Sequence, residues 1–120
     1  MKRSMVYLVG AGPGDPKLIT IKGMECIKKA DIIIYDYLVN VELLRAARPD
    51  VEFIYVGKQG GAHTLKQDEI NQLLVTKAQG DKIVTRLKGG DPYVFGRGGE
   101  EALVLYENHI PFEVVPGITA

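Results

Sequence analysis

Two kinds of hydrophobic pattern alternate along this chain. Short runs of β-branched and aromatic residues, typical of strands, are followed by longer segments in which apolar residues recur at helical spacing. The alternation predicts an α/β fold with a mostly parallel five-stranded sheet flanked by helices on both faces. The expected strands are residues 5–9, 32–35, 52–56, 82–87 and 112–115, and the expected helices are residues 19–30, 41–47, 66–79 and 99–109.

The third expected helix has the clearest local signals. Thr64, with Gln67 three positions later, fits a capping box at the start of the helix. Gly80 fits a cap at its C-terminal end. The apolar residues between them fall on one helical face, which predicts that this face packs on the sheet. They are Ile70, Leu73, Leu74 and Ala78.

The expected domain organisation is one domain over residues 1–120. This length is typical of a single domain, and an apolar content of 46% is sufficient for a hydrophobic core. The final stretch, VVPGITA, places a Pro-Gly turn directly after a strand, as at a strand-to-loop junction inside a longer protein. We therefore expect a second domain that this sequence lacks.

Charge and cysteine content narrow the classes of function. The 15 basic and 15 acidic residues cancel, so no global field draws the chain to nucleic acid or to a membrane surface. No apolar run has the length of a membrane span or of a signal sequence. The lone Cys26 permits no internal disulfide, and two histidines without further cysteines make no metal set. These features favour a cytoplasmic protein without a metal centre.

Ligands of open parallel sheets bind beyond the carboxyl ends of the strands, so the loops there are the candidate sites. The first such loop, GAGPGD, lacks the glycine spacing of a dinucleotide fingerprint. Pro13 removes an amide donor and Asp15 adds a negative charge where a phosphate would bind. A ligand with a positive reactive centre, such as the sulfonium of S-adenosylmethionine, suits this loop better. The alternative is a turn that needs glycine only for its backbone angles.

Two charged residues follow the next two strands. Asp36 comes directly after the second expected strand, and Lys58 follows the third. An acid and a base could therefore face one site at this edge of the sheet. Asp36 also lies where a dinucleotide-binding fold has its ribose-binding acid. Each residue taken alone fits a solvated loop charge equally well.

The loop after the fourth strand, RLKGGDPYVFGRGGEE, combines many glycines with opposed charges. Gly89 and Gly90 allow a ligand to approach the main chain, and Asp91 can accept hydrogen bonds from an amine or a hydroxyl. Arg97 and Glu100 could form a surface ion pair, and both Glu100 and Glu101 suit the positive end of a helix dipole. The glycines on both sides of Arg97 favour a functional role for it.

Taken together, these loops resemble those of the tetrapyrrole methylase family. The resemblance covers essentially the whole chain, through VYLVGAGPGDPKLIT, ADIIIYDYLV, YVGKQGGAHTLKQDEIN, RLKGGDPYVFGRGGEE and VVPGITA, in that order. It implies two α/β domains with S-adenosylmethionine in the cleft between them, of which residues 1–120 are the N-terminal one, in a homodimer. The implied cofactor contacts are Pro13, Gly89, Gly90, Asp91, Val94, Thr119 and Ala120.

The resemblance also implies roles in catalysis. Asp36 would be the proton acceptor and Lys58 the proton donor, with Arg97 and Glu100 facing the substrate. Glu100 is a second candidate for the base, and the residues leave the choice between it and Asp36 open. A substrate rich in carboxylates needs basic side chains, and Arg97, Lys58 and Lys88 are the local supply.

The implied reaction is C-methylation of uroporphyrinogen III at two pyrrole carbons with S-adenosylmethionine as methyl donor. It gives precorrin-2 and S-adenosylhomocysteine, in siroheme and cobalamin biosynthesis. One alternative is a sibling methylase that acts on a later corrin intermediate or on another substrate. A nucleotide-binding or interaction domain is a further alternative, although the glycine spacing of GAGPGD argues against it.

Overall fold

The computed structural model describes residues 4–57, 65–91 and 98–119. Its strands all run parallel in one five-stranded sheet, in the order β3-β2-β4-β1-β5. The expected α/β class and the expected strand segments are therefore confirmed. The strands are β1 (Met5–Gly10), β2 (Ile32–Tyr35), β3 (Glu52–Tyr55), β4 (Ile83–Lys88) and β5 (Phe112–Val115), and the α-helices are α1 (Ile21–Lys29), α2 (Gln67–Lys77) and α3 (Gly98–Glu107).

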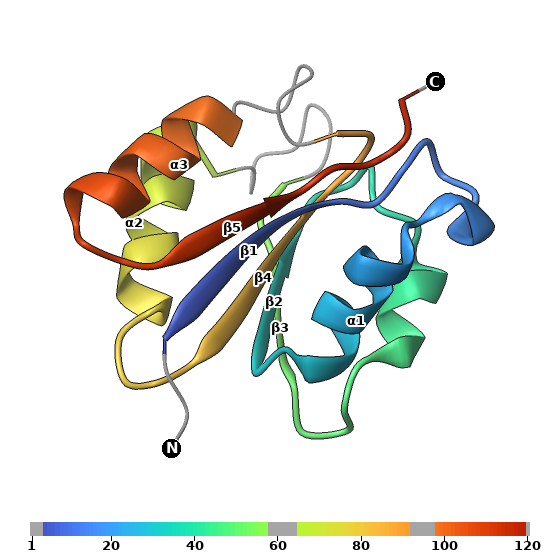
Figure 1. Cartoon of the computed structure of the whole chain (residues 1–120), viewed down its shortest axis with the longest axis horizontal. Helices are drawn as coiled ribbons and strands as arrows, with labels where there is room; N and C mark the ends of the chain where they lie inside the picture. Colours follow the sequence, from blue (N-terminus) through green and yellow to red (C-terminus); the bar gives the residue numbers. More distant parts are fainter. Residues whose placement is uncertain (1–3, 58–64, 92–97, 120) are drawn as a thin grey trace.

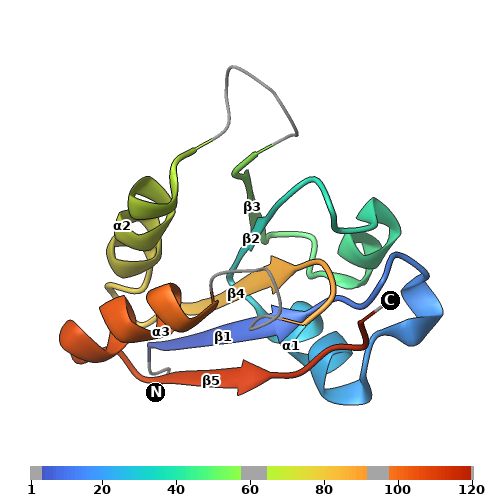
Figure 2. The same cartoon turned by 90° about the horizontal axis from the view of Figure 1, so that it is seen from above.

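Helices cover both faces of the sheet (Figures 1 and 2). On one face, α1 lies beside the 3-10 helix η2 (Val41–Ala46), and on the other, α2 lies beside α3. Each face has its own apolar core: Val6, Leu8 and Leu105 belong to the α2/α3 core, and Val9 and Ile27 to the α1/η2 core. Because both faces of β1 and β2 are buried, their sequences are almost continuous apolar runs, whereas the middle strand β4 also carries polar and charged side chains.

The first helix begins later than its hydrophobic pattern predicts. Residues Pro16–Leu18 form a short 3-10 turn, and α1 begins only at Ile21. Thr20 is the N-cap in an extended conformation, and its hydroxyl accepts a hydrogen bond from the Gly23 amide at 3.0 Å. This cap fixes the start of the helix, because a residue before the N-cap lies outside it.

The second expected helix is a 3-10 helix rather than an α-helix. It spans Val41–Ala46, with the Asn40 side chain accepting from the Glu42 amide at 2.9 Å. Pro49 follows shortly after and disfavours helical geometry at the residue before it. The segment is consequently too short to gain the cooperative hydrogen bonds of an α-helix.

The predicted capping box of α2 is wrong in its position. The helix begins at Gln67 with Lys66 as N-cap, and the carboxylate that accepts from the Lys66 amide, at 3.0 Å, belongs to Glu69. Thr64 lies outside the described residues. The predicted apolar face is confirmed, since Ile70, Leu74 and Ala78 are buried and Leu73 is partly buried. The C-cap is Ala78 rather than Gly80, which follows two residues later in the turn with a φ of 80°.

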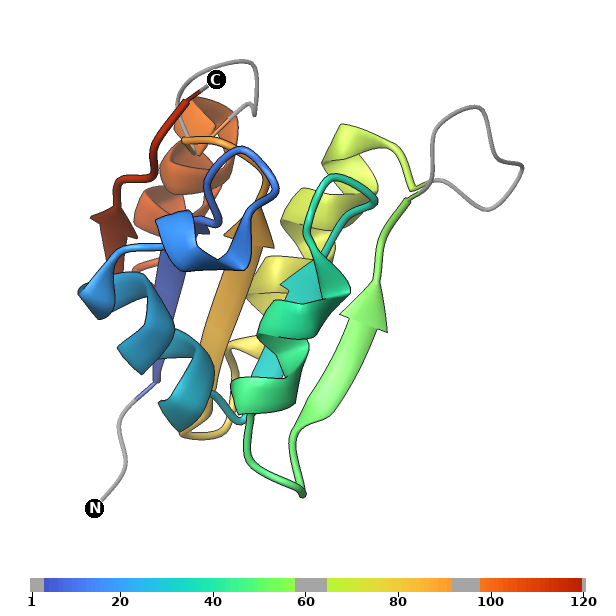
Figure 3. The same cartoon turned by 90° about the vertical axis from the view of Figure 1, so that its right-hand side faces the viewer.

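The order of the strands creates a candidate ligand site. The chain leaves β1 toward the α1 face and leaves its neighbour β4 toward the α3 face (Figure 3). In open parallel sheets, neighbouring strands whose connections leave toward opposite faces mark the place where ligands bind, at the carboxyl ends of the strands. Within the part of the chain that the structure describes, no helix is both long and apolar enough to span a membrane.

Candidate active site

The loops after β1, β4 and β5 meet at the carboxyl edge of the sheet (Figure 1). Gly12 and Gly90 form an antiparallel bridge, with the Gly90 amide donating to the Gly12 carbonyl at 2.8 Å and the Gly12 amide donating to the Gly90 carbonyl at 3.2 Å. The Ala11 amide also donates to the Lys88 carbonyl at 2.6 Å. Two of the predicted loops are therefore joined through their backbones.

Three glycines make this contact close. A Cβ atom on Gly117 would lie 2.2 Å from the Gly90 carbonyl oxygen, and one on Gly10 would lie 2.5 Å from the same oxygen. We call Gly10, Gly90 and Gly117 the glycine contact. It has no room for a side chain at Gly10 or Gly117, so packing of chain against chain accounts for both glycines.

The two glycines after β4 have different surroundings. A Cβ atom on Gly89 would lie 2.5 Å from the Cβ of Leu38, so this position is filled by the loop after β2. At Gly90 no atom of the described residues lies within 4 Å of the same position, and a φ of 68° favours glycine. Of the two, Gly90 is the position that leaves space for a ligand against the main chain.

The GAGPGD loop is held in shape by neighbouring polar groups. The Asp15 carboxylate accepts from the Lys17 amide at 2.9 Å and caps the 3-10 turn that follows. The Asn40 side chain donates to the Gly14 carbonyl at 2.8 Å and ties this loop to the start of η2. Pro13, a predicted cofactor contact, is exposed between them. The loop thus presents Pro13 on a fixed backbone.

Asp91 joins the loops after β4 and β5. Its carboxylate accepts from the Gly117 amide at 3.1 Å, across the glycine contact. Thr119 is exposed two residues farther along the same loop. Pro13, Gly90, Asp91 and Thr119 therefore all belong to loops at one edge, as the sequence predicts.

The predicted proton acceptor Asp36 lies at the same edge, after β2. One of its carboxylate oxygens, Oδ1, accepts from the Leu38 amide at 3.1 Å. The other, Oδ2, lies 3.7 Å from Nη1 of Arg86, and the Asp36 side chain is 20% exposed. Asp36 is thus held from two sides while part of it stays accessible to solvent.

Asp36 forms one end of a group of charged residues beneath α3. Glu101, in the first turn of that helix, is fully buried. Its Oε2 lies 3.3 Å from Nε of Arg86 and its Oε1 lies 3.0 Å from Nζ of Lys88. We call Asp36, Arg86, Lys88 and Glu101 the buried charge cluster. It holds two charges of each sign, as buried ionic groups require.

The surroundings of Lys88 exclude it from the substrate-binding role that the sequence predicts. Its side chain is 2% exposed and pairs with Glu101. Removal from water lowers the pKa of Lys88 below its usual value, and the nearby Glu101 carboxylate partly opposes this effect. Lys88 balances a buried carboxylate rather than facing a ligand.

Helix α2 completes the contacts of Glu101. Nε2 of Gln67 donates to Oε2 of Glu101 at 3.1 Å and to Oδ1 of Asn71 at 2.9 Å. Sequence reasoning missed this role of Glu101 and interpreted the acid as a partner of the helix dipole. A signal was available, because Arg86 and Lys88 are two positions apart on a strand and therefore share one face.

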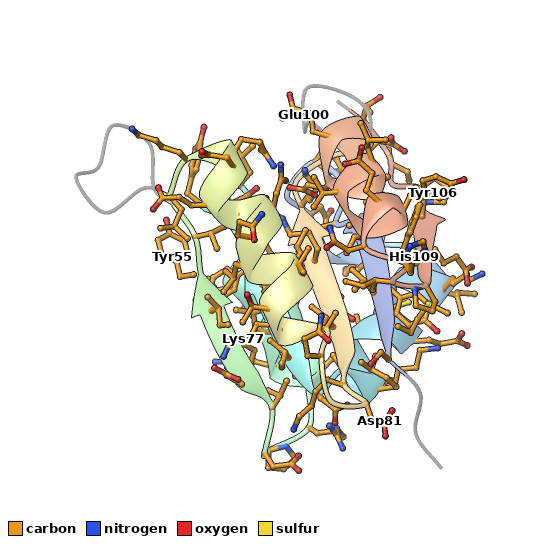
Figure 4. All side chains as sticks on the ribbon, turned by 90° about the vertical axis from the view of Figure 1, so that its left-hand side faces the viewer. Tyr55, Lys77, Asp81, Glu100, Tyr106 and His109 are labelled. Atoms are coloured by element: carbon orange, nitrogen blue, oxygen red, sulfur yellow. The ribbon has the colours of Figure 1, made fainter. Side chains whose placement is uncertain are left out.

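The remaining predicted site residues are Glu100 and four residues that lie outside the described part of the chain. Glu100 is exposed at the start of α3, at the opposite end of the molecule from Asp81 (Figure 4). Because Glu100 is exposed and Glu101 is buried, the substrate-facing role predicted for Glu100 does not involve the buried ion pairs of Glu101. The predicted residues Lys58, Val94, Arg97 and Ala120 lie outside the described residues.

The groups at the edge fit some ligands better than others. Asp15, Asp36 and Asp91 add negative charge to the loops at this edge of the sheet. Carboxylates and carbonyl oxygens accept hydrogen bonds from hydroxyl and amino groups and repel phosphate. The edge therefore fits a ligand that carries hydroxyl and amino donors and a positive charge. Among the described residues no group of three or more His, Cys, Asp or Glu side chains could hold a metal ion.

Comparisons with known proteins all point to one family for this chain. Residues 5–120 match the model of the Tetrapyrrole (Corrin/Porphyrin) Methylases. A uroporphyrinogen-III C-methyltransferase of Methanocaldococcus jannaschii is 63% identical over 115 residues, which cover 96% of this chain and 48% of that protein. One of Bacillus subtilis is 61% identical over 115 residues, covering 96% of this chain and 45% of that protein. The chain thus spans about half the length of these curated relatives.

Solved structures agree with the sequence relatives. The uroporphyrin-III C-methyltransferase of Thermus thermophilus complexed with S-adenosyl homocysteine matches with a TM-score of 0.80 and 50% identity. The match covers 96% of this chain and 45% of that chain.

Proposed function

This chain belongs to the tetrapyrrole methylase family, and from that premise we propose that residues 1–120 are the N-terminal domain of a two-domain methyltransferase. The proposed reaction is C-methylation of uroporphyrinogen III at two pyrrole carbons to precorrin-2, with S-adenosylmethionine as methyl donor. The protein would act as a homodimer in siroheme and cobalamin biosynthesis. Relatives about 60% identical carry the name of this activity, which supports the assignment.

The observation that carries the proposal is the open direction at Gly90, which no atom of the described residues fills, at an edge whose loops also carry carboxylates. Bound there, S-adenosylmethionine would supply a methyl group on a positively charged sulfur. Its amino and hydroxyl groups match the acceptors at Asp91 and in the GAGPGD loop, where Pro13 is exposed. A related structure of Thermus thermophilus holds S-adenosyl homocysteine, which supports this choice of ligand.

The protein's part in methyl transfer would be to hold the two reactants in line. Correct alignment can lower a barrier by about 7 to 11 kcal/mol without covalent help from the enzyme. The close backbone packing at the glycine contact would help to align the reactants, because it fixes the loops after β1, β4 and β5 relative to one another. Val94, Thr119 and Ala120 would add contacts to the donor.

Proton removal completes each methylation. Attack by a pyrrole carbon on the methyl group leaves a cationic ring, which becomes neutral when a proton is lost. We assign the proton acceptor role to Asp36, whose carboxylate is held at both oxygens and is partly accessible. Lys58 would be the proton donor. Arg97 would bind substrate carboxylates, and Glu100, exposed at the start of α3, would face the substrate.

A titration tests the cofactor assignment and the two-domain assignment together. S-adenosylhomocysteine is titrated calorimetrically into the 120-residue chain and into the same residues extended through the second half, here called the two-domain protein. We expect binding by the two-domain protein alone, because the chain supplies one wall of the cleft. Binding of NAD in its place, with no binding of S-adenosylhomocysteine by either protein, would favour the nucleotide-binding alternative.

A substitution tests the substrate assignment. Arg97→Ala in the two-domain protein should weaken binding or turnover of uroporphyrinogen III, because a charged contact to a carboxylate is lost. Binding of S-adenosylhomocysteine should remain nearly unchanged. Unchanged kinetics for both ligands would remove Arg97 from the site, and turnover of a later corrin intermediate instead of uroporphyrinogen III would favour a sibling methylase.

A further inference from the structure

Arg86 lies between two carboxylates that belong to different parts of the fold. Its Nε is 3.3 Å from Oε2 of Glu101 on α3, and its Nη1 is 3.7 Å from Oδ2 of Asp36 after β2. The Arg86 side chain is 3% exposed and its partner Glu101 is fully buried, so the guanidinium is enclosed. One planar group thus contacts the interior of the protein with one nitrogen and the candidate base with another.

The contact with Arg86 limits how the Asp36 carboxylate can turn. Its Oδ1 accepts from the Leu38 amide at 3.1 Å, and its Oδ2 faces Arg86. A carboxylate held at one oxygen can rotate about its remaining bonds, whereas one held at both keeps a fixed direction. Arg86 Nη1 donates to the Leu87 carbonyl at 3.3 Å, and from that fixed place its charge favours the orientation of Asp36 in which Oδ2 faces it.

Arg86 is itself held by Glu101. Besides Arg86, Glu101 accepts from Gln67 of α2 at 3.1 Å and pairs with Lys88 at 3.0 Å. These contacts link two helices and β4 to the candidate base. They leave the Arg86 guanidinium little freedom to move.

Stability alone is a weak reason for this arrangement. Replacing a buried ion pair with apolar residues of similar volume is often neutral or stabilising. Ordinary core packing would therefore have been served by apolar residues at Arg86, Lys88 and Glu101 together. A buried guanidinium that reaches a partly exposed carboxylate has a use that apolar residues cannot supply, which is to fix the direction of that carboxylate.

We propose that Arg86 is a positioning residue for proton removal, acting through Asp36, and that Glu101 holds Arg86 in place for this purpose. The inference rests on the proposed function, in which Asp36 accepts the proton. Arginine is required because its planar fork contacts two carboxylates in fixed directions. A lysine at this position keeps the positive charge but presents a single ammonium group.

The test is a double-mutant cycle in the two-domain protein. Methyl transfer to uroporphyrinogen III is measured with radiolabelled S-adenosylmethionine for the wild type, Arg86→Lys, Asp36→Asn and the double variant. We expect Arg86→Lys to lower kcat by about 10- to 100-fold, since small errors in placement near the reacting atoms have effects of that size. The KM for S-adenosylmethionine and the affinity for S-adenosylhomocysteine should change less than about twofold, because Arg86 acts through Asp36.

The background with Asp36→Asn separates positioning from general damage. In that background Arg86→Lys should change kcat by less than about twofold, because the group it positions is already lost. Arg48→Lys is the matched control: Arg48 also pairs with an aspartate, Asp31, and bonds to the Ala30 carbonyl at 3.1 Å at the other edge of the sheet. This control should leave kcat unchanged in both backgrounds.

Each outcome decides between the hypotheses. An unchanged kcat for Arg86→Lys, an equal loss in both backgrounds, or an unchanged kcat for Asp36→Asn would overturn the positioning role while the wild type remains an active methyltransferase. A wild type that does not methylate uroporphyrinogen III would overturn the proposed function itself. The wild-type rate thus distinguishes the failure of one from the failure of the other.

Discussion

Gly117→Ala should destabilise the chain strongly for a change of one methyl group. The new Cβ would lie 2.2 Å from the Gly90 carbonyl oxygen and 2.8 Å from both Cα and the carbonyl carbon of Gly10. Restoring van der Waals contact requires a shift of about 1 Å. Overpacking of this kind costs about 1 to 3 kcal/mol. We expect the upper end, about 3 kcal/mol, because the obstructing atoms are backbone and cannot change rotamer.

Urea denaturation followed by circular dichroism measures this cost. With a slope of about 2 kcal/mol per M, the midpoint should fall by about 1.5 M. Gly80→Ala is the matched control: Gly80 has a φ of 80° and open space around its Cβ position, so it carries backbone strain without a clash. It should cost about 1 kcal/mol. If Gly117→Ala unfolds at the wild-type midpoint, or if both variants lose the same stability, the glycine contact is not tightly packed.

Three further predictions concern the cluster, the core and the edge. Glu101→Gln should lower the free energy of unfolding by about 3 kcal/mol in the same assay, because Arg86 and Lys88 then lose their shared buried carboxylate. Glu100→Gln, at the exposed neighbouring position, should lower the free energy of unfolding by less than about 0.5 kcal/mol. Burial raises the pKa of the Cys26 thiol above its ordinary 9.0. As pH rises, the thiol of the unfolded chain therefore loses its proton at a lower pH than the thiol of the folded chain. The stability that the thiol contributes is complete below pH 9 and declines as pH rises through the raised pKa, and Cys26→Ala should flatten the fall of the urea midpoint across that range. Gly90→Ala should weaken calorimetric binding of S-adenosylhomocysteine to the two-domain protein at least about tenfold, whereas Gly80→Ala, equally strained but distant, should leave it unchanged.

The sheet and its functional edge could be predicted because both follow from local patterns. Runs such as IIIY are readable as strands buried on both faces, and parallel strands bring their following loops to one edge. The position of Asp36 and Asp91 at that edge therefore follows from the sequence without knowledge of the strand order. The cap of α2 is mispredicted because Thr64 and Gln67 match the usual capping box, whereas the observed N-cap, Lys66, is not a typical capping residue.

The buried charge cluster could not be predicted in the same way. Whether Glu100 or Glu101 faces the interior depends on how α3 rotates onto the sheet, which a ten-residue helix with acids in its first turn does not reveal. The burial of Arg86 depends on strand pairing, since Leu8 and Ile34 flank it in the sheet. Close approach at Gly117 likewise requires the position of β5 beside β1, which depends on the strand order.

The position of β1 has a consequence for synthesis of the protein. Among the described residues, β1 pairs with β4 and β5, and its register with β4 runs from Met5–Ile83 to Gly10–Lys88. At about 5 to 20 residues per second, the ribosome needs about 4 to 16 s to advance from Gly10 to Lys88. During that interval β1, an apolar strand that is buried between two neighbours in the finished sheet, is a nascent segment without its partners. Chaperone contact with the emerging chain should therefore be strongest before β4 is translated and should decline once β4 can pair.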